Sequence, residues 1–212
     1  EIFGIHDYIK DVCRRLAREG YVAIAPDYFD RAGDPAPLTD FAEIRQIVAT
    51  ANYEQVMGDT EGALTWLAAQ AFVNADAIGV TGFCWGGTVV WMASARFPQI
   101  KAGVAWYGRL VRPQPGSWGA EEERPWPYDI GGTLQTPVLG LYAENDQGIP
   151  LASVEQMRAS LQAADNPSRS EIVVYPGTVH GFHADYRESY NAEAAADGWA
   201  RLLAWYRANG VS

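Results

Sequence analysis

The sequence predicts the α/β fold class, with a mostly parallel sheet and helices on both of its faces. Short apolar runs of strand length alternate along the chain with segments of helical periodicity, and this alternation is typical of such sheets. The chain has 212 residues, of which 48% are hydrophobic, enough for one domain with a sizeable core. Because it shows no linker and no internal repeat, we expect a single domain over residues 1–212.

The expected elements follow in order along the chain. Apolar residues from Ile9 to Leu16 have helical spacing, and Gly20 lies where this first helix should end. Residues Tyr21–Tyr28 (YVAIAPDY) then indicate a buried strand that Pro26 closes. Later strands are expected at Ala77–Gly82, Ala102–Gly108, Pro137–Ala143 and Ser170–Pro176. Later helices are expected over Asn52–Ala69, over Thr88–Arg96, from Leu151 to Leu161 and from Trp199 to Tyr206.

Composition narrows the class of function. Asp plus Glu total 26 and Lys plus Arg total 16, a formal charge of -10, and no basic stripe is visible. Nucleic acids and anionic membranes are therefore poor partners, and no apolar stretch reaches the roughly 18 residues of a membrane span. Without a signal-peptide pattern, we expect a cytoplasmic protein, with an exported form as the alternative.

One of the two cysteines lies at a corner between a predicted strand and a predicted helix. The stretch GFCWG around Cys84 has the form Gly-x-nucleophile-x-Gly, in which glycines avoid clashes beside a tightly turned residue. The helix start points its amides and positive dipole end at Cys84, which favours the thiolate. A buried structural cysteine is the alternative interpretation. Cys13, on the apolar stripe of the first helix, is expected to be structural.

A nucleophilic cysteine needs a base, and the base needs an acid that orients it. The chain has three histidines. His180 follows the last predicted strand and is the expected base. His6 is expected to cap the first helix or to lie on the surface, while His183 is expected to line the pocket or to lie on the surface.

Two carboxylate residues, Glu144 and Asp146, follow the predicted strand at residues 137–143. Asp146 is the expected acid because it lies further into the loop, and Glu144 is the reserve. A turn carboxylate without a catalytic role is the alternative for such a residue. The order Cys84, Asp146, His180 is nucleophile, acid and histidine, which is the order found in α/β-hydrolases.

With these residues in view, the chain resembles the dienelactone hydrolase family, whose members are cysteine-dependent and have the α/β-hydrolase fold. The resemblance covers essentially the whole chain and rests on four blocks: EIFGIHDYIKDVCRRLAREGYVAIAPDYF, GFCWGG, NDQGIP and YPGTVHGFHADYRESY. Since the family has strands before the first of these blocks, the resemblance implies that N-terminal strands of the fold precede Glu1 and are missing from this sequence.

The resemblance also implies a role for individual residues. The nucleophile, acid and base would be Cys84, Asp146 and His180. Glu1 would contact the resting thiol and hold it protonated. The amides of Ile2 and Trp85 would form the oxyanion hole.

Substrate contacts are expected beside this site. Trp106 and Tyr107 end a predicted strand, and with His183 they are the expected substrate-binding residues. Type members of the family hold a carboxylated lactone with arginines, one of them a few residues after the histidine. Here the first arginine after His180 is Arg187, which departs from that pattern.

The expected function is hydrolysis of a small ester or lactone, as in dienelactone hydrolase, through a thioester acyl-enzyme. No cofactor is expected, and no metal, because the sequence has neither an HExxH motif nor a Cys/His cluster. The expected partner is the small-molecule substrate, and the chain is expected to be a monomer or homodimer. The alternatives are a redox-sensing or reactive-thiol protein that uses Cys84 and a non-catalytic binding protein on the same fold.

Overall fold

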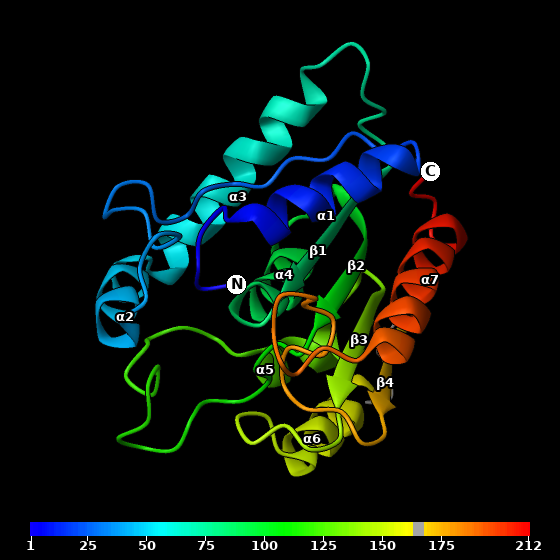
Figure 1. The fold of residues 1–212 in the computed structure, drawn as a ribbon. Helices are drawn as coiled ribbons and strands as arrows, with labels where there is room; N and C mark the ends of the chain where they lie inside the picture. Colours follow the sequence, from blue (N-terminus) through cyan, green and yellow to red (C-terminus); the bar gives the residue numbers. More distant parts are fainter. Residues whose placement is uncertain (163–167) are drawn as a thin grey trace.

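A four-stranded parallel sheet lies at the centre of the structure, a computed structural model that describes residues 1–162 and 168–212 (Figure 1). Its strands lie in the order β1-β2-β3-β4 and span Ile78–Phe83, Ile100–Trp106, Val138–Ala143 and Glu171–Tyr175. All neighbouring strands pair in parallel, so their carboxyl ends meet at one edge. The predicted α/β class is confirmed.

Helices occupy every segment where helical spacing predicted them. In chain order they are α1 (Asp7–Arg18), α2 (Phe41–Thr50), α3 (Tyr53–Ala68), α4 (Trp85–Arg96), α5 (Pro127–Ile130), the 3-10 turn η1 (Gly131–Thr133), α6 (Leu151–Leu161) and α7 (Ala192–Ala208). Local signals set their ends: the side chain of Asn52 accepts the N–H of Gln55 at the start of α3, and that of Asn191 accepts the N–H of Ala194 at the start of α7.

The helix α2 was not predicted, although its signals are present. Asp40 precedes it and accepts the N–H of Ala42, while Ile44 and Val48 bury its apolar stripe. The polar, proline-rich segment just before the helix obscured this short pattern.

Helices cover both faces of the sheet. Gly103 of β2 packs against Val90 and Ser94 of α4, whereas Trp106 of the same strand packs against Gly198 of α7. Because these two positions differ by an odd number of residues, they point to opposite faces. The α4 face also carries α3, and the α7 face carries α1, which shares its buried cluster. None of the described helices is long and apolar enough to cross a membrane.

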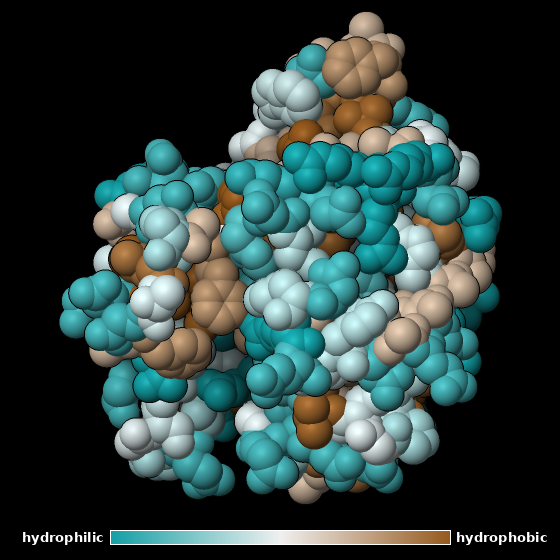
Figure 2. Space-filling view, in the orientation of Figure 1, coloured by the Kyte–Doolittle hydropathy of each residue, from teal (hydrophilic) through white to brown (hydrophobic). Residues whose placement is uncertain are grey.

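The strand predicted at Tyr21–Tyr28 is wrong. Its residues pair with no strand of the described sheet, and Val22 and Ile24 are 45% and 37% exposed. The segment and the edge strand β1 line opposite parts of a groove of about 390 Å³. Apolar residues also gather over the end of α3 and the chain after it, where Trp66 is 49% and Phe72 69% exposed (Figure 2).

At the carboxyl edge of the sheet, glycines allow the backbone of α4 to pack closely against the ends of the strands. A Cβ at Gly82, in β1, would lie 2.4 Å from the carbonyl oxygen of Gly86, in α4. A Cβ at Gly108 would lie 2.3 Å from the carbonyl carbon of Gly87. These approaches bring the start of α4 directly against the ends of β1 and β2 and fix the turn between them.

Replacing Gly82 by alanine tests this close approach. Because the backbone atom that the new Cβ meets cannot move aside, we expect the free energy of unfolding to fall by ~1–3 kcal/mol. The matched control is Gly62→Ala in α3, where a Cβ meets nothing within 4 Å and the higher helix propensity of alanine should raise that free energy by about 0.5–1 kcal/mol. Chemical denaturation measures both, and an unchanged Gly82→Ala variant would contradict the packing.

Candidate active site

Cys84 occupies a strained turn between β1 and α4. Its backbone has φ 56° and ψ -118°, a region that residues with a side chain rarely adopt. The turn is held by the N–H of Cys84, which donates to the carbonyl of Trp106 at 2.9 Å, and by the N–H of Gly87, which donates to the carbonyl of Cys84 at 2.9 Å. The predicted strand-to-helix elbow is therefore present, and Cys84 at its tip is half-buried.

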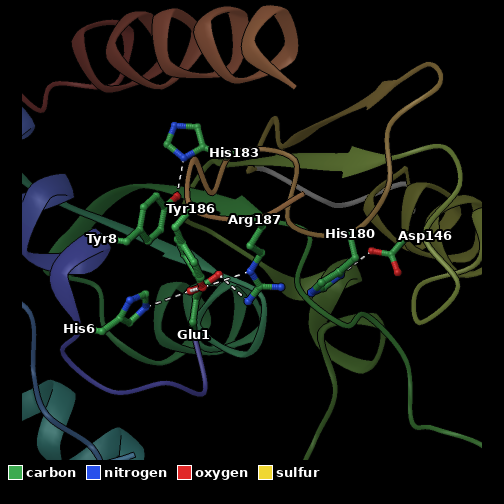
Figure 3. Close-up of polar contacts among 8 residues, drawn as sticks. All are labelled: Glu1, His6, Tyr8, Asp146, His180, His183, Tyr186 and Arg187. Atoms are coloured by element: carbon green, nitrogen blue, oxygen red, sulfur yellow. Dashed lines mark hydrogen bonds and ion pairs between the residues drawn. The ribbon is translucent and has the colours of Figure 1, made fainter. Parts of the chain in front are cut away.

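Asp146 and His180 meet on the loops that follow β3 and β4. Nδ1 of His180 lies 2.6 Å from Oδ2 of Asp146 (Figure 3). The other carboxylate oxygen of Asp146 accepts the N–H groups of Gly148 and Ile149 at 2.8 and 3.1 Å. Asp146 is thus held by its own turn and is 5% exposed, while the ring of His180 remains partly accessible.

Cys84 and His180 shift each other's pKa. Burial opposes the charge on His180, but hydrogen bonds with Asp146 and with Cys84 raise its pKa to about 10. Burial likewise opposes the thiolate of Cys84, but the hydrogen bond and the charge of His180 bring the pKa of the thiol below its ordinary value. The structure therefore brings the predicted acid and base into contact, and the charge of His180 acts on the Cys84 thiol.

Glu1 lies in a second polar cluster beside the triad. Its carboxylate accepts hydrogen bonds from the Tyr186 hydroxyl at 2.7 Å and from Arg187 at 3.3 Å, and it pairs with Nε2 of His6 at 3.1 Å (Figure 3). Burial alone would raise the pKa of Glu1, but the hydrogen bond with His6, the charges of the α-amino group and of Arg187, and the hydrogen bond from Tyr186 lower it. Glu1 is therefore a charged, buried carboxylate.

Glu1 was expected to contact the thiol of Cys84, but in the structure it acts on the thiol through its charge. The hydrogen bonds of Glu1 go to the three residues of its own cluster, and Cys84 instead interacts with His180. Glu1 still acts on the thiol through its charge, because that charge raises the pKa of Cys84 against the effect of His180.

The two residues expected to supply an oxyanion hole flank the elbow. Trp85 is the first residue of α4, so its amide has no partner within the helix. Ile2 is buried and shares an apolar cluster with Trp85, and the backbone nitrogen of Glu1 approaches Gly86. Both predicted residues thus lie at the start of α4.

The expected substrate residues lie deeper than their prediction implied. His183 is 2% exposed, and its ring stacks on Phe83 and lies 4.3 Å from the ring of Trp106, which is itself 0% exposed. Burial and the charge of Arg15 lower the pKa of His183 to about 3, and Nδ1 of its neutral ring shares a hydrogen bond with the Tyr8 hydroxyl. Tyr107 is likewise 0% exposed. Substrate contact by His183, Trp106 and Tyr107 does not fit these positions, since none of the three rings is open to a ligand.

Several residues of the site were missed from the sequence. Tyr186 and Arg187 bind Glu1 across 185 and 186 positions of chain. His6 precedes α1 as expected, but its side chain makes no capping hydrogen bond and binds Glu1 instead. No spacing rule connects residues so far apart, and the histidine block that contains Tyr186 and Arg187 was the only available signal.

Comparison with known proteins agrees with this geometry. A family model described as "Dienelactone hydrolase family" matches residues 1–209. A protein of Methylorubrum extorquens named "Putative carboxymethylenebutenolidase" is 46% identical, over 100% of this chain and 71% of its own length. A Bradyrhizobium protein named "Probable 2-oxo-3-(5-oxofuran-2-ylidene)propanoate lactonase" is 31% identical, over 97% of this chain and 80% of its own. The crystal structure of a "Putative Dienelactone Hydrolase" from Klebsiella pneumoniae matches with TM-score 0.89 and 45% identity, over 98% of this chain and 83% of that chain.

Replacing Asp146 by asparagine tests the acid assignment. The amide keeps the shape of the side chain but stabilises the wrong tautomer of His180, so we expect kcat for ester hydrolysis to fall on the order of 10³–10⁴-fold with the fold intact. Glu144→Gln is the matched control, because Glu144 is exposed and its carboxylate accepts the backbone N–H of Gly177. Steady-state kinetics would contradict the assignment if Glu144→Gln were crippled and Asp146→Asn mild.

Proposed function

The chain belongs to the dienelactone hydrolase family, and on this premise we propose that it hydrolyses a small ester or lactone with Cys84, His180 and Asp146 as its catalytic triad. The observation that carries the proposal is the chain of interactions from Asp146 through His180 to Cys84, with an Asp146–His180 contact of 2.6 Å. An acid, a base and a nucleophile in that sequence support acyl transfer.

Acylation begins at the thiolate. The sulfur of Cys84 attacks the carbonyl carbon of the ester, and the carbonyl oxygen takes the negative charge. The amides of Ile2 and Trp85 stabilise this oxyanion, and loss of one such donor typically costs ~10²–10³ in rate. As the tetrahedral species collapses, the bond between carbon and alcohol oxygen breaks, and His180 gives its proton to the leaving alkoxide.

Hydrolysis of the thioester regenerates the enzyme. Neutral His180 takes a proton from a water molecule, whose oxygen attacks the thioester carbonyl. Collapse of the second tetrahedral species breaks the bond between carbon and sulfur and releases the carboxylic acid. Asp146 keeps the imidazole oriented and stabilises its charged form at both stages.

Glu1 controls the resting thiol in this proposal through its charge. A carboxylate near a thiolate disfavours ionisation of the thiol, so Glu1 opposes His180 and limits the thiolate population. A lower thiolate population slows oxidation of the free enzyme, since the thiolate is the species that oxidants attack. The cluster of His6, Tyr186 and Arg187 keeps Glu1 ionised for this role.

Replacing Cys84 by alanine tests the function itself. We expect the variant to fold and to lose hydrolysis of p-nitrophenyl acetate, because no other nucleophile stands at the elbow. Cys13→Ala is the control: Cys13 is a partly buried residue of α1, and its loss should leave turnover within about twofold, as for most changes away from a site. Full activity in Cys84→Ala would reject the triad.

Replacing Glu1 by glutamine tests the electrostatic role. Removing the charge should lower the pKa of the Cys84 thiol, so iodoacetamide should label it faster at any pH below that pKa. The measurement uses a Cys13→Ala background, in which Cys84 is the single cysteine. Glu54→Gln, which breaks an exposed ion pair with Arg96, should label at the background rate. Equal rates for Glu1→Gln and its background would show that Glu1 does not act on the thiol.

A further inference from the structure

His183 is a polar residue among aromatic rings. It is 2% exposed, and its ring stacks on Phe83 at 5.2 Å and on Trp199 at 6.0 Å between centroids, while the ring of Trp106 lies at 4.3 Å. A phenylalanine would make the same ring contacts without the cost of burying ring nitrogens. The histidine is therefore explained by what its nitrogens do.

One ring nitrogen of His183 joins two segments of the chain. Nδ1 shares a hydrogen bond of 2.5 Å with the hydroxyl of Tyr8, in α1 (Figure 3). Both groups are uncharged, because burial lowers the pKa of His183 to about 3 and raises the pKa of the Tyr8 hydroxyl. A hydrogen bond in such an apolar interior is strong and directional. It ties the loop after β4 to α1 with one orientation of the histidine ring.

The same loop carries the proposed base. Residues 176–191 form neither helix nor strand, and His180 lies in this loop three residues before His183. The N–H of Ala184 donates to the carbonyl of Gly181 at 2.9 Å, and Gly181 has φ 81°, so a tight turn connects the two histidines. Phe182 packs this turn through its ring, and the bond of His183 adds a fixed direction. The position of His180 therefore follows from that of its buried neighbour.

The pair of Tyr8 and His183 also touches the strand that carries the nucleophile. Phe83, on which the ring of His183 stacks, directly precedes Cys84. The ring of Tyr8 packs against Phe83 as well, at 5.5 Å between centroids. One buried pair thus contacts the elbow and holds the turn of the base.

We propose that Tyr8 and His183 are positioning residues for His180: their hydrogen bond fixes the turn that carries the base at the place where His180 acts on Cys84. The inference rests on the proposed function, in which His180 is the base and Cys84 the nucleophile. Without the bond, Asp146 still orients the imidazole, but the turn gains freedom relative to the elbow. A misplacement on the order of 1 Å can cost 10²-fold in rate.

The test compares Tyr8→Phe and His183→Phe, which break the bond from either side, with the double variant that lacks both partners. Each change keeps an aromatic ring in place. Both single variants should unfold at a lower temperature, because each leaves a buried polar group unpaired, and the double variant should recover much of that loss. In contrast, kcat should fall about tenfold in all three variants, with KM within about twofold.

Alkylation of Cys84 by iodoacetamide, in the Cys13→Ala background, gives a second readout that needs no turnover. His180 lowers the pKa of the thiol, so a displaced base should raise that pKa by about half a unit. Labelling at a pH below it should then slow about threefold. The other titratable or charged groups that face the thiol are unchanged in all three variants: Glu1 with its α-amino group, Arg187 and Tyr107.

Tyr142→Phe is the matched control. Its hydroxyl is also buried, and it accepts a hydrogen bond from Nε1 of Trp91 at 3.0 Å. The control should lose stability as the single variants do, but it should leave kcat and the pKa of the Cys84 thiol unchanged.

Recovery of both stability and kcat in the double variant overturns the inference, because the bond would then only stabilise the fold. Unchanged kcat and thiol pKa in the single variants overturn it as well. Full activity of Cys84→Ala would instead reject the proposed function, so the two failures are distinguishable. Should a single variant not fold, the double variant decides, since neither partner of the bond remains in it.

Discussion

The rest of the site depends on the turn at Cys84. At φ 56° the residue carries backbone strain that only close surroundings can maintain, and two glycine contacts provide them: Gly82 against Gly86 and Gly87 against Gly108. These contacts place the start of α4 against the ends of β1 and β2. Because the strands are parallel, the loops after β3 and β4 then carry the acid and the base to the same edge.

Two charged residues shift the pKa of the Cys84 thiol in opposite directions. Asp146 and Cys84 raise the pKa of His180, and the positive charge of His180 favours the thiolate. The buried carboxylate of Glu1 disfavours the thiolate. The nucleophile is then neither permanently charged nor inert, which suits a cysteine that must react with an ester and resist oxidation between turnovers.

The sequence predicted the parts of the molecule that local signals determine. The paired strands and the helices around them have clear periods and caps. Asp146 and His180 each follow a strand end, so their contact was predictable. The strand at Tyr21–Tyr28 was wrong because a strand requires a neighbour, and apolar composition does not reveal whether one is present. The contacts of Glu1 with Tyr186 and Arg187 join opposite ends of the chain, and the burial of His183 depends on packing between elements, neither of which a local pattern encodes.

The central claim is that Cys84 carries the acyl group during turnover. Mixing the protein with p-nitrophenyl acetate, quenching with acid within the first turnovers and mapping the peptides by mass spectrometry tests it most directly. We predict an acetyl group on the peptide that contains Cys84, removable by neutral hydroxylamine as a thioester is, and longer-lived in His180→Ala because water then lacks its base. An active protein whose acyl group appears on another residue, or on none at any quench time, would contradict the account.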